Sequence, residues 1–347
     1  VVEGHPVGRP SGSRYMPDAP ARSEAARALL AAARRALKGE LARRLAAAES
    51  APDEAFTLAP EGVFVWAQSA TESAAVGRIV AGPALLAPAA APDPDNLLEA
   101  AQNDRLRARL ERRLAAQVAR DLKPLADLMN ADLPTGPARG LAFQLAEAGG
   151  LLPRAALGAE LATLDAASRA ALWGLGVRIG LRHVYMPALL KPAAVAMAGM
   201  LWATRCGQPL GLPLPAPLPA PGRVSFPADP AWPADYWAAV GYPLAGTRAV
   251  RADMLERFER LLLDKGGSAE PAALARLLAL RAAELDGVLE GLGYVRHAAE
   301  DGAISWRPGR TARIAAVERR PARDRRAAAK PIAPDHPFAA LAQLRKK

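Results

Sequence analysis

Residues 176–192 read GVRIGLRHVYMPALLKP, and this stretch mixes charged and apolar side chains more closely than any other part of the chain. Arg178 and Arg182 are four residues apart and Tyr185 follows three residues later, so on a helix these three side chains would share one face. The prolines at positions 187 and 192 predict bends, because the residue before a proline avoids helical backbone angles.

Two interpretations of this stretch follow from its residue types. A cationic and aromatic face suits a nucleic-acid strand, because phosphates need positive charge and bases stack on flat rings. The alternative is an amphipathic core helix whose polar face is solvated. The candidate nucleic-acid-binding residues of the stretch are Arg178, Arg182, His183, Tyr185 and Lys191.

Short helical patterns surround this stretch over residues 133–206, and prolines and glycines at their joins predict a compact bundle of short helices. Asp165 precedes one of these patterns and is expected to cap its N-terminus. Residues 207–222, GQPLGLPLPAPLPAPG, predict an extended proline-rich linker. The alternative for this segment is a ligand for a proline-recognising partner.

Residues 1–132 contain one pattern twice. Val7-Gly8-Arg9 recurs as Val76-Gly77-Arg78, and the Arg-Arg-Leu-Ala-Ala run that starts at Arg43 recurs at Arg112, each 69 residues further on. The sequence therefore predicts tandem modules of a β-hairpin and a long helix, with helices over about residues 23–48 and 96–130 and a kink at Pro124. Arg9 and Arg78 are candidate phosphate contacts; the alternative is that the glycine beside each arginine simply permits a turn.

Residues 223–308 begin with an aromatic patch and a helical pattern, and end with two helical patterns and two β-prone runs around Asp301-Gly302. This order predicts a winged-helix-like unit that places Arg281 and Glu284 in a nucleic-acid groove and Arg296 or Arg307 on phosphates. Winged helices also make protein contacts, and the acidic positions 284, 286 and 290 disfavour a DNA groove. Both roles stay open at this point.

Residues 309–347 carry eleven basic and three acidic side chains, so this tail holds +8 of the net charge of +10. Its composition cannot bury a core, and we expect it to be disordered. Phe338, Leu341 and Leu344 are spaced by three residues and predict a short helix that docks on a protein partner. The candidate nucleic-acid-binding residues of the tail are Arg319, Arg320, Arg325 and Arg326.

Several enzyme classes are excluded by missing patterns. The chain contains no GxxxxGK[ST] loop, no DExH box and no GxGxxG after a β-prone run. Its four histidines lack metal-ligand spacing, and Cys206 is the only cysteine, which excludes an intramolecular disulfide and a multi-cysteine zinc site. We therefore predict no catalytic residue, no metal site and no cofactor bound by this chain.

Membrane-span and signal-peptide patterns bear on where in the cell the protein acts. No apolar run approaches the ~18 residues of a membrane span, and the first residues lack a signal-peptide pattern. We expect a cytoplasmic protein without a membrane partner. Because the chain begins at Val1 rather than at a methionine, we also expect it to be a fragment of a longer protein.

Several stretches resemble one protein family. These are EGHPVGR and MPD near the start, GPARGLAFQLAEAGGLLPR at 136–154, the stretch at 176–192, SFP at 225–227, GTRAVRADMLERF at 246–258 and PFAALAQL near the end. Together they resemble the C-terminal half of a bacterial family of ATP-dependent superfamily 2 helicases related to the mitochondrial RNA-degradosome helicase. Ser11-Gly12-Ser13 departs from the more hydrophobic strand that the resemblance implies.

The resemblance implies a parent protein whose motor lies upstream of Val1 and couples ATP hydrolysis, with magnesium, to movement on RNA or DNA. The family's ATP-binding and catalytic residues have no counterpart in this chain, so none is assigned and the chain should not be catalytic alone. We thus expect a nucleic-acid-binding accessory region of an RNA or DNA helicase. The alternative is a protein-interaction scaffold that docks a nuclease or a ribosomal partner, without intrinsic catalysis.

The expected fold is mainly α. It comprises two hairpin-plus-long-helix modules (1–132), a short-helix bundle (133–206), a proline-rich linker (207–222), an aromatic patch with a helix and a winged-helix-like unit (223–308), and a disordered basic tail (309–347).

Overall fold

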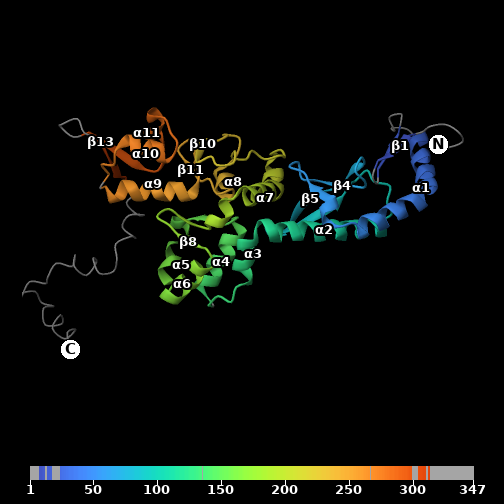
Figure 1. Cartoon of the computed structure of the whole chain (residues 1–347), viewed down its shortest axis with the longest axis horizontal. Coiled ribbons are helices and arrows are strands. Elements are labelled where there is room, and N and C mark those ends of the chain that lie inside the picture. Colours follow the sequence, from blue (N-terminus) through green and yellow to red (C-terminus); the bar gives the residue numbers. More distant parts are fainter. Residues whose placement is uncertain are drawn as a thin grey trace, which may run out of the picture.

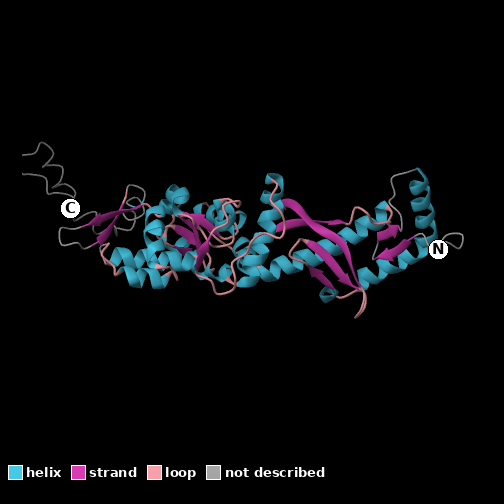
Figure 2. Cartoon of the chain, turned by 90° about the horizontal axis from the view of Figure 1, so that it is seen from above, coloured by secondary structure: helices cyan, strands magenta, loops and turns pink. Residues whose placement is uncertain are grey.

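The computed structural model of the chain describes residues 8–11, 14–17, 24–134, 136–265, 267–298, 304–309 and 312. The molecule is elongated, with α1 (Glu24–Ser50) at one end and α9 (Ala252–Asp264) near the other (Figure 1). The view from above shows the same long shape, in which small sheets alternate with helices (Figure 2). A lobe that contains α4 (Pro137–Glu147) and α6 (Ala166–Gly174) lies below α9 in the view of Figure 1.

A four-stranded antiparallel sheet follows α1 in the sequence and packs against the second long helix, which comes after the sheet. Its strands, in spatial order, are β3 (Phe56–Leu58), β4 (Val63–Ala67), β5 (Ser73–Ala84) and β6 (Ala87–Pro92). Alternate residues point toward α2 (Ala100–Asp121), so Phe56, Phe64 and Trp66 are buried with Leu110 and Leu114. Phe56 and Trp66 lie opposite each other, and their rings stack with centroids 6.0 Å apart.

The two copies of the Gly-Arg pattern lie on strands with the same register. β1 (Gly8–Ser11) pairs with β2 (Arg14–Pro17), which places Gly8 opposite Pro17, and β5 pairs with β6, which places Gly77 opposite Pro92. A Cβ at Gly77 would lie 2.6 Å from the Ala91 oxygen and from a methyl of Leu110. This glycine therefore permits the close approach of α2 rather than a turn.

The long helices begin and end near the positions that the sequence predicts. α1 ends at Ser50, and the predicted helix over 96–130 is divided at Leu122 into α2 and α3 (Lys123–Asn130). Pro124 lies in the first turn of α3, where its missing N–H needs no partner. The proline therefore begins a new helix instead of kinking one long helix.

The middle of the chain combines short helices with a three-stranded antiparallel sheet. The elements of this part are β7 (Leu151–Pro153), a 3-10 turn over Arg154–Leu157, α5 (Gly158–Thr163), α6, β8 (Arg178–Ile179), β9 (His183–Tyr185), a 3-10 turn over Pro187–Leu190 and α7 (Pro192–Trp202). β9 is the central strand, between β7 and β8. The predicted N-cap is confirmed, because a carboxylate oxygen of Asp165 accepts a hydrogen bond from Ser168 N at 2.7 Å.

The proline-rich segment packs against the folded chain. It follows a π-turn over Ala203–Gly207 and begins with a 3-10 turn over Gln208–Leu210, and the hydroxyl of Tyr236 donates to the Pro217 oxygen at 2.6 Å. The aromatic patch of the sequence forms a buried cluster beside it, in which Trp202, Trp232, Tyr236 and Trp237 contact one another.

A small sheet and three helices complete the chain toward its C-terminus. Strands β10 (Ser225–Pro227), β12 (Arg248–Val250) and β11 (Leu244–Ala245) lie in that order in the sheet. α8 (Ala234–Ala239) lies between β10 and β11 in the sequence and contacts β11. α9, α10 (Pro271–Leu277) and α11 (Ala282–Gly291) enclose a core around Phe258 and Leu289. β13 (Tyr294–Ala298) and β14 (Ile304–Pro308) form an antiparallel hairpin after them.

The predicted mainly α fold class is wrong. The structure is 51% helix and 20% strand, and the strands form several small antiparallel sheets, so it is a mixed α/β fold. The second N-terminal module contains a four-stranded sheet instead of a lone hairpin, and the predicted short-helix bundle contains the sheet of β7, β8 and β9. β6 reads APAAAP, and alanine and proline disfavour strands, so only its pairing with β5 decides its conformation.

Candidate nucleic-acid interface

The stretch at 176–192 is a β-hairpin followed by a 3-10 turn, so the expected helix is wrong. β8 pairs with β9, and Arg178 lies directly opposite Tyr185. Gly176 has a φ of 89°, which ends α6 in a conformation that favours glycine. Arg178 and Tyr185 are therefore neighbours across two strands, rather than along one helix face.

Arg178 stacks on an exposed tryptophan that the sequence reasoning missed. Its guanidinium carbon lies 3.8 Å from the ring centroid of Trp173, on α6. Nη1 of Arg178 also donates to the carbonyl oxygens of Trp173 and Val177, at 3.0 and 3.1 Å, which fixes the guanidinium over the ring. Trp173 is 62% exposed, so most of the indole stays open to solvent.

Tyr185 lies beside this stack and near a second arginine. Burial raises the pKa of the Tyr185 phenol, with smaller contributions from the carboxylates of Glu256 and Asp253, whereas Arg178 and Arg260 act in the opposite direction. Arg260 is an exposed residue of α9. We call Trp173, Arg178, Tyr185 and Arg260 the platform.

Arg182 points away from the platform into the junction with the C-terminal helices. Its Nε lies 2.5 Å from Oε1 of the buried Glu259, and its Nη2 donates to the carbonyl oxygen of Leu292. The hydroxyl of Tyr294 donates to the same Glu259 oxygen at 3.1 Å. The guanidinium of Arg182 thus connects the β8–β9 turn to α9 and to the C-terminal end of α11.

Glu256 of α9 holds the backbone of the same turn. Its carboxylate accepts hydrogen bonds from the amides of Leu181, Arg182 and His183, the last two at 3.0 Å. Burial on its own would raise the pKa of Glu256, but the neighbouring His183 and the amides of Leu181 and Arg182 outweigh it, so the pKa lies below its ordinary value. Burial raises the pKa of Glu259, and Arg182 opposes this only in part.

The remaining candidate residues are scattered over the molecule. His183 is buried, with Nδ1 3.6 Å from Oε1 of Glu256, and Lys191 is exposed just before α7. Arg78 is exposed on β5, and Arg296 and Arg307 are exposed on β13 and β14. Arg9 lies on β1, but its side chain is outside the described part, as are Arg319, Arg320, Arg325 and Arg326.

The structure therefore brings together only two of the sequence candidates, Arg178 and Tyr185, and adds Trp173 and Arg260. Trp173 precedes Arg178 by five residues, and the intervening Gly174 and Gly176 are a turn signal that the helical interpretation overlooked. No local signal indicates Arg260, because α9 reaches the hairpin only through the tertiary fold.

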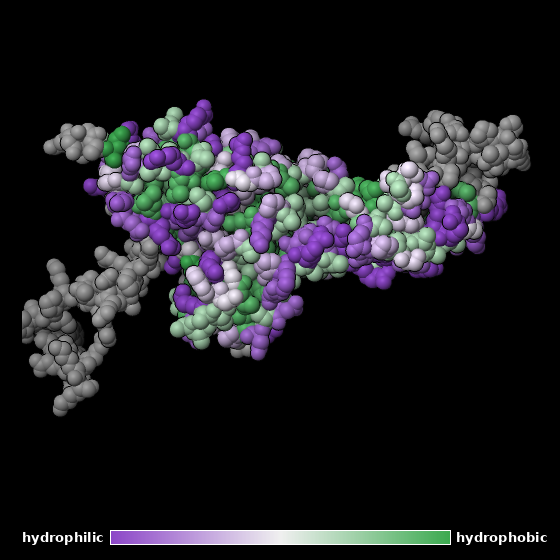
Figure 3. Space-filling model, viewed as in Figure 1, coloured by the Kyte–Doolittle hydropathy of each residue, from purple (hydrophilic) through white to green (hydrophobic). Residues whose placement is uncertain are grey.

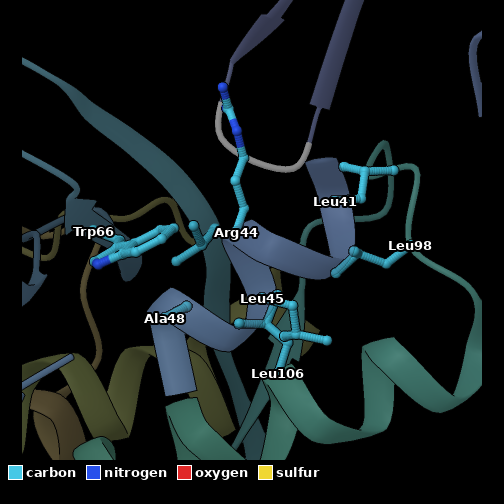
Figure 4. Close-up of a pocket in the computed structure, with 8 residues that line it drawn as sticks. Leu41, Arg44, Leu45, Ala48, Trp66, Leu98 and Leu106 are labelled. Carbon is cyan, nitrogen blue, oxygen red and sulfur yellow. The ribbon is translucent and has the colours of Figure 1, made fainter. Parts of the chain in front are cut away.

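One hollow near the N-terminal end of the molecule is too small for a ligand. A pocket between α1 and the four-stranded sheet holds about 20 Å³, room for about one water, and its lining is apolar apart from Arg44. Arg44 points away from the leucines of this pocket (Figure 4) and binds Glu40 at 2.6 Å. Among the described residues, no group of histidine, cysteine, aspartate and glutamate side chains could hold a metal ion.

Comparisons with known proteins leave the family open. No family model, curated protein or solved structure matches this chain. Within the described ranges, no helix has the length and apolar character needed to cross a membrane.

Proposed function

We propose that this chain binds a single strand of RNA or DNA through the platform, as an accessory region of an ATP-dependent helicase. The observation that supports this most directly is the guanidinium of Arg178 held over the largely exposed indole of Trp173. An exposed ring beside fixed positive charge matches the two chemical features of a strand, because bases stack on aromatic rings and phosphates attract cations.

The parts of the platform have separate roles in this proposal. A base stacks on the open part of the Trp173 indole, while Arg178 and Arg260 supply positive charge for the phosphates of the strand. Tyr185 supports Arg178 across the strand pair and offers a hydroxyl. Because every base has a flat face and every nucleotide a phosphate, binding is expected to be independent of sequence and sensitive to salt.

The helicase setting of the proposal rests on the resemblance of the sequence stretches. In this setting the motor supplies ATP hydrolysis with magnesium, and the present chain supplies affinity for the strand. The arginines of the tail add attraction that does not depend on sequence.

Fluorescence anisotropy with labelled single-stranded RNA and DNA, at two salt concentrations, tests the proposal. Trp173→Ala and Arg178→Ala should each weaken binding by about tenfold, since loss of a stacking ring costs about 1 to 3 kcal/mol. Arg112→Ala, which removes an exposed arginine of α2 far along the chain, is the matched control and should bind like the wild type. Equal binding by all four proteins would contradict the proposal.

A protein-interaction scaffold is the second candidate function. Val295 and Ile304 are 51% and 41% exposed on the β13–β14 hairpin, and exposed apolar side chains on a hairpin favour protein contact. Capture of a nuclease or ribosomal protein from nuclease-treated lysate, lost in a Val295→Asp/Ile304→Asp variant, would favour this function. Capture that disappears with nuclease treatment would instead point to a nucleic-acid bridge.

A further inference from the structure

We propose that the groove between α3 and α4 is a second stacking subsite for the same nucleic-acid strand. This inference rests on the proposed function and extends it from one base-binding position to two. The groove encloses about 470 Å³, which is within the usual range for small-molecule sites and is ample for one base. We call it the α3–α4 groove; it is lined by Leu128, Met129, Ala131, Leu133, Gly136, Arg139, Gly140, Ala142 and Phe143.

Phe143 and Arg139 present a ring and a charge together at this groove. They are four residues apart on α4, so both side chains lie on the same helix face. Phe143 is 56% exposed, and Arg139 is exposed without a hydrogen bond or ion pair to any described residue. A planar base against Phe143 and a phosphate on Arg139 would use both groups.

Gly140 keeps the floor of the groove open. A Cβ built on Gly140 would meet no atom within 4 Å, so the space over this turn of α4 is empty. A flat ring can therefore approach the helix backbone between Arg139 and Phe143. A larger residue at position 140 would occupy the space that the base needs.

The platform also combines an exposed ring with an arginine, although there the guanidinium stacks directly on the ring. Among the phenylalanine, tyrosine and tryptophan side chains whose burial the structure describes, only Phe143 and Trp173 are largely exposed, and each has an arginine nearby. α4 packs against α6 in one lobe of the molecule (Figure 1), and apolar residues reach the surface of this lobe among hydrophilic ones (Figure 3). An apolar peptide would match the rings but not the two arginines, whereas a strand matches both.

The arrangement also selects the class of nucleic acid. A base reaches either ring only when it is unpaired and turned out of its stack, so a duplex is excluded from both positions. A strand that occupies both must be longer than one that occupies the platform alone. We therefore infer that affinity rises with strand length and that the rise depends on Phe143 and Arg139.

Anisotropy with single-stranded oligonucleotides of about 4 and about 12 residues, both within the range of known strand-binding sites, tests this inference on the full chain. Phe143→Ala and Arg139→Ala should weaken binding of the long oligonucleotide by about tenfold or less and leave the short one nearly unchanged. Gly140→Leu should have the same effect by filling the groove. Gly39→Leu, at an equally open helical position on α1, is the control and should bind both like the wild type.

The outcomes separate this inference from the proposed function. If Trp173→Ala weakens binding of both lengths while the groove variants bind like the wild type, the second subsite is wrong and the platform stands. If neither Trp173→Ala nor the groove variants weaken binding, both proposals fail. Melting temperatures equal to that of the wild type establish that the variants are folded, as expected for exposed positions.

Discussion

The carboxylate of Glu256 lies so close to Gly180 that a Cβ at position 180 would be 2.4 Å from its carboxyl carbon. The glycine leaves room for the carboxylate to reach the amides of the next three residues. A side-chain carboxylate of α9 is thereby hydrogen-bonded to backbone amides of the β8–β9 hairpin. These bonds fix the hairpin, which carries Arg178 and Tyr185, to the C-terminal part of the molecule.

Gly180→Ala should destabilise the protein by about 1 to 3 kcal/mol, because the added methyl must displace a buried carboxylate. Urea unfolding measures the change. Gly140→Ala is the matched control: its Cβ meets no atom within 4 Å, so its stability should be unchanged or higher by up to about 1 kcal/mol. Equal stability of Gly180→Ala and the wild type would show that the contact is easily relaxed.

Glu256→Gln should cost about 1 to 3 kcal/mol at neutral pH, because the amide is a weaker acceptor for the three backbone N–H groups. The folded pKa of Glu256 is lowered, so its ionised form stabilises the fold above the unfolded value of about 4.3, and this stabilisation is lost as pH falls through the lower folded value. The difference in unfolding free energy between wild type and variant should therefore shrink toward acidic pH. A constant difference across the titration would contradict this assignment.

Arg182→Ala should destabilise the protein by about 3 to 5 kcal/mol, since it leaves the carboxylate of Glu259 buried without its cationic partner. The helical interpretation of the sequence, by contrast, places Arg182 on a face that would contact a nucleic-acid strand. The double variant Arg182→Ala/Glu259→Gln should recover part of the loss, and calorimetry of the full cycle measures the coupling. Arg178→Ala, which removes a stack on an exposed ring and two hydrogen bonds to backbone carbonyls near the surface, should cost less, about 1 kcal/mol.

Replacement of Arg319, Arg320, Arg325 and Arg326 by glutamine should reduce the salt dependence of strand binding. Each lost phosphate contact lowers the slope of log K against log salt by about 0.7 for a single strand. The slope is obtained from anisotropy titrations over several salt concentrations, with the Arg112→Ala variant as a control for loss of a distant charge. An unchanged slope would show that these four arginines of the tail do not contact the phosphates of the strand.

Local sequence signals predicted the positions of many helices and strands but few of the contacts between them. The Ala-rich pattern over 23–48 corresponds to α1, Asp165 caps α6, and the β-prone runs near Asp301-Gly302 form the β13–β14 hairpin. These features depend on residues close in sequence, so capping, helix propensity and strand propensity suffice to find them. The expected fold class is wrong because β6, which is rich in alanine and proline, and the short strands β7, β8 and β9 depend on pairing with neighbouring strands, which no local pattern indicates.

The stretch at 176–192 distinguishes most clearly the properties that the sequence determines from those that the tertiary structure determines. Its sequence alone established which chemical groups are present: arginines and a tyrosine among apolar residues, in a chain with no ATP-binding pattern. Only the tertiary structure decided that Arg178 faces solvent on Trp173 while Arg182 lies in the junction with Glu259. The physical reason is that Glu256 and Glu259 lie 73 to 77 residues further along the chain, and burial against α9 outweighs the local spacing that favoured a helix.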